Sequence, residues 1–314
     1  MHEIISFLKD AVTRGPTPGI VGCYIVRGGS IYARNQAMQA GVAMASEVEF
    51  SVPADEFDAA LGRMKEVQSL TVDNDSITIK AGRLKATIKC DTDEPPPLPN
   101  MPSEWLACPA GLTAALSLAR PFLGERGWSQ GIRLMDGHVT ALSNPSGIDI
   151  SVEGLKLEPA LITEDVAAFL ITQGNPDEYH ASEDALMFRW ANGRWLRAQL
   201  LTDKMPDVER LFAAAGDETP VAITPEWRQA YEDAAALSDG TVKLTKDGLH
   251  SLKGASSSVV EILTDVPNDH VSFWATKIFD PIVACAQSWN PAAHPSAALF
   301  KGHNLRGVVM GKRS

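Results

Sequence analysis

Residues that could do acid–base, metal or nucleophilic chemistry are scattered along this sequence. The seven histidines are dispersed, and neighbouring carboxylates occur in "SEDA" and "TEDVA", where helix or turn capping explains them better than a paired acid and base. The sequence contains no Walker loop, no G-x-G-x-x-G after a strand, no H-E-x-x-H and no G-x-S-x-G. We therefore expect a protein that is not an enzyme and needs neither cofactor nor metal. A hydrolase that uses dispersed carboxylates stays open as an alternative.

The composition indicates a folded protein. Of the 314 residues, 45% are hydrophobic and 21% are charged, which predicts packed cores instead of disorder. No apolar run approaches the roughly 20 residues that a membrane span needs, so we expect a cytoplasmic protein with no membrane partner. The net charge of −11 disfavours nucleic acid on average, although a local basic stripe can outweigh that mean.

The elements that position the side chains recur three times along the chain. One set of turn glycines is spaced by 111 and 109 residues, and a second set by 108 and 111 residues. These two sets are Gly82, Gly193 and Gly302, and Gly29, Gly137 and Gly248. Two independent markers with one period predict a threefold internal repeat.

Each repeat is expected to contain two helices and about seven or eight strands. Thr224 followed by Pro225 is a helix start signal, and Thr163 before two acids is another. The proline-rich "TDEPPPLPNMPSE" and the segment "TDKMPDVERLFAAAGDETP" separate the repeats. The predicted fold class is α+β, with domains at 1–99, 100–215 and 216–314.

Two stretches of the sequence resemble a known family. "RWLRAQLLTDKMPDVERLF" resembles the close of the second domain of the bacterial-type DNA sliding clamp, the β subunit of DNA polymerase III, and "VVMGKRS" resembles its C-terminal end. The matching positions are Lys204, Met205, Pro206, Asp207, Arg210, Val308, Val309, Met310 and Arg313. Gly311, Lys312 and Ser314 depart from the family, and the shortened chain suggests a bacteriophage or otherwise divergent member.

The resemblance implies three tandem clamp domains, each with two helices inside and two β-sheets outside, in a crescent that dimerises head to tail into a ring. Such a ring is a processivity factor, which encircles double-stranded DNA without reading its sequence. It tethers the DNA polymerase, the clamp loader and other replication proteins through short linear motifs. A clamp-fold scaffold or decoy that does not encircle DNA remains the alternative.

The resemblance also implies two sets of site residues. A hydrophobic groove for partner peptides between domains 2 and 3 would be formed by Ser143, Ile148, Val242, Leu244, Val308, Val309, Met310 and Arg313. The DNA-facing cations would be Lys9, Arg14, Arg63, Lys65, Arg120, Arg126, Arg228 and Lys277. The same helices also carry Asp55, Glu56, Asp58, Glu164 and Asp165, so the expected inner charge is modest.

Overall fold

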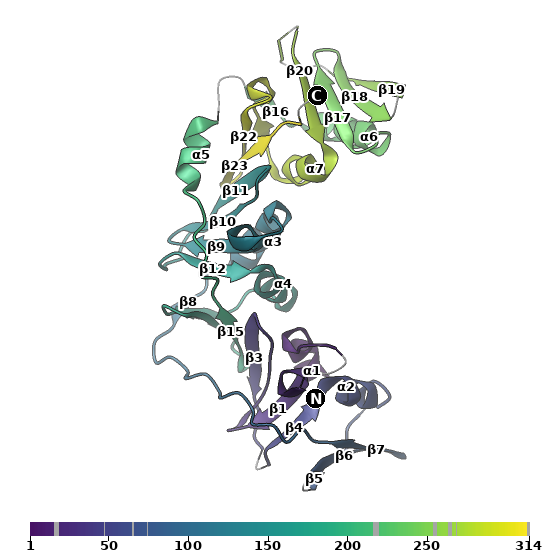
Figure 1. The fold of residues 1–314 in the computed structure, drawn as a ribbon, viewed down its shortest axis with the longest axis vertical. Helices are drawn as coiled ribbons and strands as arrows, with labels where there is room; N and C mark the ends of the chain where they lie inside the picture. The colour runs from purple at the N-terminus through teal and green to yellow at the C-terminus, as the bar shows by residue number, and fades with distance from the viewer. Residues whose placement is uncertain are drawn as a thin grey trace. The chain divides into compact units, whose positions relative to one another are not determined.

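The computed structural model repeats one series of elements three times (Figure 1). It describes residues 1–15, 19–46, 48–64, 66–73, 75–215, 220–253, 256–262, 266–267 and 269–312. Repeat 1 comprises α1 (His2–Leu8), β1 (Cys23–Arg27), β2 (Ser30–Arg34), β3 (Met38–Ala43), β4 (Phe50–Pro53), α2 (Ala54–Leu61), β5 (Ser69–Asp73), β6 (Ser76–Ala81) and β7 (Leu84–Lys89).

Repeats 2 and 3 follow the same order. Repeat 2 comprises β8 (Leu106–Ala107), α3 (Leu112–Ala119), β9 (Gly131–Met135), β10 (His138–Leu142), β11 (Ser146–Ser151), β12 (Ala160–Thr163), α4 (Glu164–Gln173), β13 (Glu178–Ala181), β14 (Ala185–Arg189) and β15 (Arg194–Gln199). After α5 (Val208–Ala214), repeat 3 comprises β16 (Val221–Ala222), α6 (Pro225–Ala236), β17 (Thr241–Thr245), β18 (Gly248–Lys253), β19 (Ser256–Glu261), β20 (Val271–Ala275), α7 (Thr276–Cys285), β21 (Ser288–Trp289), β22 (Ala297–Gly302) and β23 (Leu305–Met310).

Seven strands of every repeat pair in the same way. Four of them pair in the orders β4-β1-β2-β3, β12-β9-β10-β11 and β20-β17-β18-β19, and the last three form the meanders β5-β6-β7, β13-β14-β15 and β21-β22-β23. Repeats 2 and 3 also begin with a short strand, β8 or β16, which pairs with β13 or β21. All pairs are antiparallel. The α+β class and the threefold repetition expected from the glycine spacing are confirmed.

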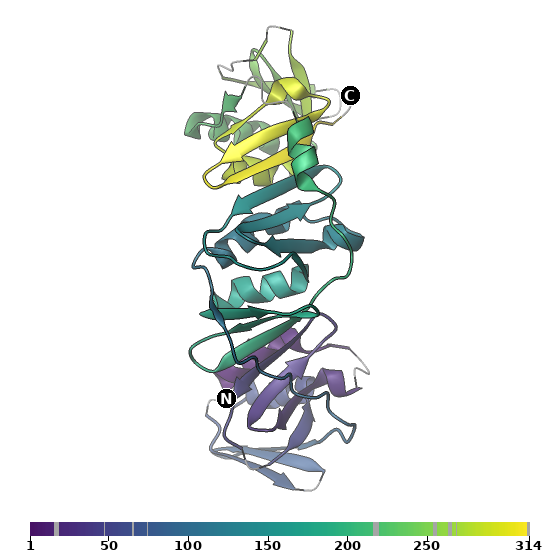
Figure 2. The same cartoon turned by 90° about the vertical axis from the view of Figure 1, so that its left-hand side faces the viewer.

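Successive repeats join through their sheets. β3 pairs with β15, and β11 pairs with β23, which produces two eight-stranded sheets that each cross a repeat boundary. Figure 2 shows the second junction, where the yellow strands lie beside the teal ones. Repeat 2 therefore contributes to both compact units of the chain, unit 1 (1–108 and 168–200) and unit 2 (109–167 and 201–314). The boundaries at 99/100 and 215/216 stay predictions.

The two junctions use the same register. Ser30 and His138 each follow a turn glycine, and they pair with Ala43 and Ser151, respectively. Ala43 and Ser151 then occupy equivalent positions beside the neighbouring repeat. The Ala43 amide donates to the Gly193 carbonyl at 3.2 Å, as the Ser151 amide donates to the Asn304 carbonyl at 2.8 Å. One position further, Val42 lies opposite Arg194, and Ile150 lies opposite Leu305.

Helix starts and cores follow the local sequence signals. The Thr224 hydroxyl accepts a hydrogen bond from the Trp227 amide at 3.2 Å, with Pro225 at the first helical position, as predicted. Trp274 and Phe279 are core residues. Trp289 packs against both of them, with ring centroids 4.6 Å away in each case, in the aromatic core of repeat 3.

Candidate functional site

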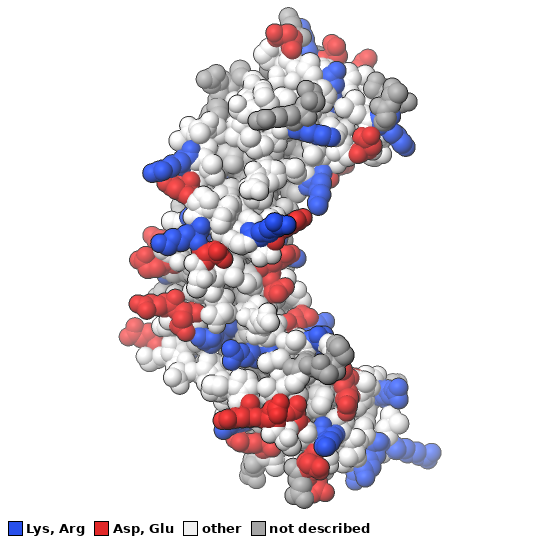
Figure 3. Space-filling view, viewed as in Figure 1, with Lys and Arg blue, Asp and Glu red and all other residues white. Residues whose placement is uncertain are grey.

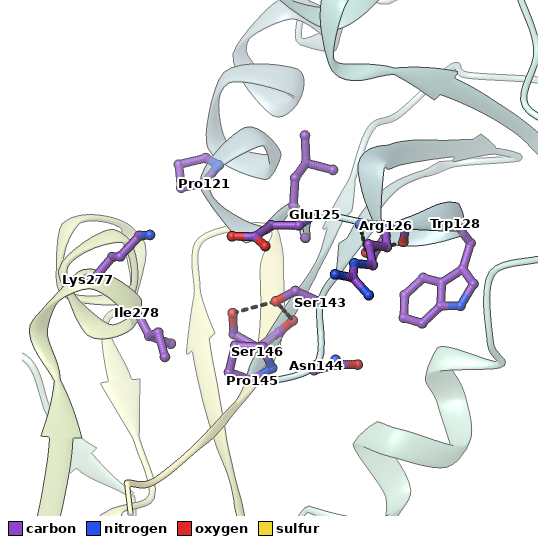
Figure 4. Close-up of a pocket in the computed structure, with 13 residues that line it drawn as sticks. Pro121, Glu125, Arg126, Trp128, Ser143, Asn144, Pro145, Ser146, Lys277 and Ile278 are labelled. Atoms are coloured by element: carbon purple, nitrogen blue, oxygen red, sulfur yellow. Dashed lines mark hydrogen bonds between the residues drawn. The ribbon is translucent and has the colours of Figure 1, made fainter.

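A cavity of about 620 Å³ opens in unit 2, between the part of repeat 2 that belongs to this unit and repeat 3. Three segments line it: the loop 121–129 after α3, the turn 143–146 between β10 and β11, and Lys277 and Ile278 at the start of α7 (Figure 4). The size lies within the range of ligand-binding pockets, which is about 300–1,000 Å³.

The turn that forms one wall of the cavity is held by its own hydrogen bonds. The Ser143 amide donates to the Ser146 carbonyl at 2.7 Å, and the Ser143 hydroxyl donates to the same oxygen at 3.0 Å. The Met310 amide donates to the Pro145 carbonyl at 2.8 Å, which ties the last strand to this turn. Both serines are buried, so this wall is pre-formed.

The charges around the cavity come from Glu125, Arg126 and Lys277, all exposed. Among the residues that the structure describes, no carboxylate lies within ion-pair distance of Arg126 or Lys277. The apolar part of the wall comes mainly from Trp128, Ile278 and Pro121, whose side chains Figure 4 places around the opening. The cavity therefore offers apolar walls with two cations and one acid at its rim.

Trp128 connects the cavity to an apolar cluster, which we call the Val308 cluster. Its buried members are Leu142, Val208, Phe212, Ala215, Leu299 and Val308, and Trp128, Met205 and Ala297 pack against them. In Figure 1, α5 covers this side of β11 and β23, while α3 and α7 lie on the other side. Arg306 anchors α5. Its guanidinium pairs with Glu209 and Asp149 and lies 4.5 Å over the Phe212 ring.

The structure brings together part of the predicted groove set. Ser143 lines the cavity, Val308 lies in the adjoining cluster, and Met310 is 42% exposed next to the turn at Pro145. Ile148 and Val309 are buried on the opposite side of the same sheet, because alternate strand residues face opposite ways.

The other predicted groove residues lie elsewhere. Val242 and Leu244 are fully buried in β17, in the separate four-stranded sheet of repeat 3, and Arg313 lies outside the described residues. The sequence reasoning missed the loop 121–129 and the cluster residues of α5. The segment "MPDVERLF", which already carried the resemblance, was the signal for α5.

Three of the predicted DNA-facing cations are occupied by partners within the chain. Arg14 pairs with Asp55, and with Asp58 at 2.7 Å. Burial alone would lower the Arg14 pKa, but hydrogen bonds to those two carboxylates raise it above its ordinary value.

The other two are Arg120 and Arg228. The Arg120 guanidinium pairs with Glu164 at 3.0 Å, and Arg228 donates to the carbonyls of Val283 and Ala286. All three cations therefore already have hydrogen-bond or ion-pair partners within the chain.

The other predicted DNA-facing cations lie on different parts of the surface. Lys9 and Arg63 are exposed and have no ion pair within the described part of the chain, and Arg63 lines a second cavity beside β7. Arg126 and Lys277 line the cavity of unit 2. Lys65 lies outside the described residues.

The six helices of the repeats carry more acid than base. Their charged residues are the ten carboxylates Glu3, Asp55, Glu56, Asp58, Glu164, Asp165, Glu226, Glu232, Asp233 and Asp280 and the two cations Arg228 and Lys277. On the face drawn in Figure 3, acidic and basic side chains are interspersed. Over the described ranges, no helix is long and apolar enough to cross a membrane.

The repeats, their sheet order and their two junctions define the DNA sliding-clamp fold, as three solved structures establish. The chain is similar to the DNA polymerase sliding clamp of Caulobacter crescentus, with a TM-score of 0.83, 14% identity, and 99% of this chain and 97% of that one covered. No protein-family model and no curated protein sequence matches the chain.

The other two similar structures are also bacterial clamps. One is the DNA polymerase III β subunit of Pseudomonas aeruginosa, with a TM-score of 0.81 and 14% identity over 99% of this chain and 97% of that one. The other is the Helicobacter pylori β clamp bound to a DNA ligase peptide, with a TM-score of 0.79 and 13% identity over the same shares. The resemblance read from the two sequence stretches is thereby confirmed for the fold.

Proposed function

We propose that the chain is a DNA polymerase processivity factor. Two copies close head to tail into a ring around double-stranded DNA, and the ring tethers replication proteins without catalysing a reaction. The full-length likeness to bacterial sliding clamps supports this function. The observation that carries it is a pair of unused sheet edges, one in each compact unit.

Among the edge strands, β7 and β19 are the two that lack the pairing which their counterparts make in the other repeats. In repeats 2 and 3, the last meander strand pairs with the preceding repeat, whereas β7 of repeat 1 has a single strand neighbour in the described chain. β3 of repeat 1 and β11 of repeat 2 pair with the following repeat, whereas β19, their counterpart in repeat 3, has one neighbour in the described chain. An exposed edge is a template for pairing, and a second copy supplies the complementary one.

The register of this third junction follows from the other two. Gly248 pairs with Thr245 across a two-residue turn, as Ser30 pairs with Arg27 and His138 pairs with Met135. Gly248 also pairs with Glu261, which makes Glu261 the counterpart of Ala43 and Ser151. Val260 is then the counterpart of Val42 and Ile150. Leu84, which pairs with Ala81 at the hairpin end, is the counterpart of Leu305. Val260 should therefore face Leu84 of the partner subunit.

Exposure agrees with this register. Leu84 is 49% exposed and Val260 is half-buried, so both apolar side chains keep surface that a second copy can cover. The same logic applies to Leu237, which is 54% exposed and follows the buried Ala234 by three residues, as Phe122 follows Ala119. Phe122 stacks on Phe300 at 5.8 Å in the second junction.

Leu237 has a matching cavity to enter. The cavity beside β7, about 390 Å³ in volume, lies between that strand and α2, and Met64, Leu84 and Ile88 are among its walls. Because α2 and β7 correspond to α7 and β23, this cavity corresponds to the place that Phe122 fills in the second junction. Burial of these apolar surfaces contributes about 25 cal/mol per Å² to association.

The cavity of unit 2 is proposed as the docking groove for partner peptides. Apolar anchors of a linear peptide would contact Trp128, Ile278 and Met310, and the pre-formed turn at Ser143 lowers the ordering cost on the clamp side. Val308 supports the groove from the cluster behind it.

Replacing Trp128 and Ile278 with alanine should weaken peptide binding by at least about tenfold, because two apolar walls are lost together. The probe is the DNA ligase peptide that the Helicobacter pylori clamp binds, labelled for fluorescence anisotropy. Trp105→Ala is the control, since that indole belongs to unit 1 and does not line the groove. Equal affinity of the double variant and the control would remove this cavity as the groove.

Topological binding to DNA tests the proposed function itself. Dimers closed from monomers in the presence of nicked circular plasmid should stay bound through high salt and be released when the plasmid is linearised. Since Arg14, Arg120 and Arg228 are already partnered, phosphate contacts should be few and the salt dependence of sliding shallow. Lys9→Ala and Arg63→Ala should each reduce the slope of log K against log salt by about 1.

The helix charges favour one second candidate, a clamp-fold scaffold that does not encircle DNA. Ten helix carboxylates against two cations would repel phosphates. A closed dimer that is lost equally from circular and linear DNA would support the scaffold and contradict the processivity function.

A further inference from the structure

A row of four polar side chains and one methionine crosses the sheet of unit 1. Arg34 on β2 pairs with Gln39 on β3, Gln39 pairs with Arg197 on β15, and Arg197 pairs with Met187 on β14. His180 on β13 continues the row by pairing with Met187. Residues that pair directly share one face of a sheet, so these five side chains form one band across five strands.

The equivalent row in unit 2 is apolar. Leu142 lies five residues after its turn glycine, as Arg34 does, and it pairs with Gly147, which pairs with Val308, which pairs with Leu299. That row is the floor of the Val308 cluster, and the linker helix α5 closes over it. At the same place in unit 1, the sequence has replaced leucine and valine with two arginines.

The linker over the row in unit 1 leaves a cavity instead of a packed core. The segment 97–102 crosses the face and encloses about 640 Å³, with Arg34, Gln39, Met187, Arg197 and His180 among the lining side chains. Carbonyls of this linker hold it to the sheet: the Tyr32 hydroxyl donates to the Pro96 carbonyl at 2.7 Å, and the Gln39 side-chain amide donates to the Pro97 carbonyl at 3.3 Å.

The composition of the linker explains why the cavity stays open. Pro97, Pro99 and Pro102 have no N–H, so this segment cannot pair with the sheet as an added strand. A guanidinium also resists complete burial without a partner, which prevents the linker from collapsing onto Arg34 and Arg197. Leu98 and Met101 provide the apolar part of the cavity.

The electrostatics of the cavity are positive. Arg197 pairs with Asp184 at 2.8 Å, and the Asp184 side chain is 72% exposed at the rim. Arg34 is exposed and has no carboxylate partner among the residues that the structure describes. Gln39, only 5% exposed, adds a fixed polar side chain to the floor. One carboxylate thus faces two guanidinium groups.

We propose that this cavity is a second docking site, which binds an acidic linear peptide segment. An Asp or Glu side chain of the segment pairs with Arg34 and competes with Asp184 for Arg197, and a neighbouring apolar side chain packs against Met187, Leu98 and Met101. Arginine suits a carboxylate because its planar fork makes two parallel hydrogen bonds. The site is distinct from the groove of unit 2 and goes beyond the proposed processivity function.

Fluorescence anisotropy with two labelled peptides tests this site on the full chain. The probe is Gly-Glu-Leu-Glu-Leu-Glu-Gly, and its matched control is Gly-Gln-Leu-Gln-Leu-Gln-Gly. We expect the acidic peptide to bind at least tenfold more tightly than the neutral one at 50 mM salt. Arg34→Gln should remove most of this difference, whereas Asp184→Asn should strengthen binding several-fold because Arg197 is released.

Lys80→Gln is the control variant, because it removes an exposed cation of unit 1 away from the cavity. Retained circular dichroism spectra verify the fold of every variant. Equal binding of the two peptides, or an Arg34→Gln variant that matches Lys80→Gln, would overturn the proposal. Displacement of the peptide by free glutamate or inorganic phosphate at similar concentration would assign a small-anion site and overturn the peptide assignment.

Discussion

Leu84→Asp is expected to leave the chain folded and monomeric. In the isolated chain, Leu84 is 49% exposed, so its own unit loses little stability by the change. In the proposed third junction it faces Val260 of the partner subunit, where a carboxylate would lose its hydration without gaining a partner. We expect dimerisation to weaken at least about 100-fold, and Val260→Asp should have the same effect.

Sedimentation equilibrium measures this result, since the dimer must have twice the 33.8 kDa of the chain. Val271→Asp is the matched control, because that valine is 44% exposed on β20, at the other edge of the sheet that contains β19. Leu84→Lys combined with Val260→Glu should restore the dimer, since opposite charges on facing strands attract. Dimers of undiminished strength in both aspartate variants would refute closure through β7 and β19.

Phe122→Ala should cost about 3–5 kcal/mol of stability, the usual range for a buried phenylalanine. Phe122 is 1% exposed, and its ring stacks on Phe300 of the following repeat. The loss should appear as faster amide hydrogen exchange in β11 and β23, the two strands that join repeats 2 and 3.

Leu118→Ala is the control for this change, because Leu118 lies on α3 just before Phe122 and is 39% exposed. Its expected cost is below about 1 kcal/mol. Equal destabilisation by the two variants would mean that Phe122 contributes nothing to the junction beyond the helix itself.

The repeat could be predicted from the sequence because a turn imposes a local requirement. Gly29, Gly82, Gly137 and Gly193 all adopt positive φ, which glycine reaches without strain, and their spacing therefore reveals the period. The helix start at Thr224 is equally local. Signals of this kind can be read from a few neighbouring residues, without knowledge of any distant contact.

The candidate site could be predicted only in part, because it depends on register. Trp128, Leu142, Phe212 and Val308 come from four distant segments that meet through the pairing of β11 with β23. The sequence pattern does not distinguish Val308 from Val309. In the strand, however, Val308 faces α5 and Val309 faces the opposite side of the sheet, where α3 and α7 lie.

For a related reason, the sequence could not show which of the predicted DNA-facing cations have acidic partners. Arg14 reads as a solvated base in its local sequence, but its two acidic partners lie 41 and 44 residues away. Long-range ion pairs of this kind are invisible to helix periodicity, so the predicted DNA-facing set remains a proposal in which Lys9 and Arg63 are the unpartnered members among the described residues outside the groove.

The repeated register at the two internal junctions has a consequence for assembly. β7 and β19 are different surfaces, so the contact proposed between them would be heterologous, and each added chain would expose the same pair of edges again. Such an interaction stops growing only when the rotation per repeat adds up to a full circle. Gly41 lies against the Trp195 indole in the first junction, and a bulkier residue there would alter this rotation. Substitution at Gly41 should therefore shift the protein from closed particles toward open helical filaments.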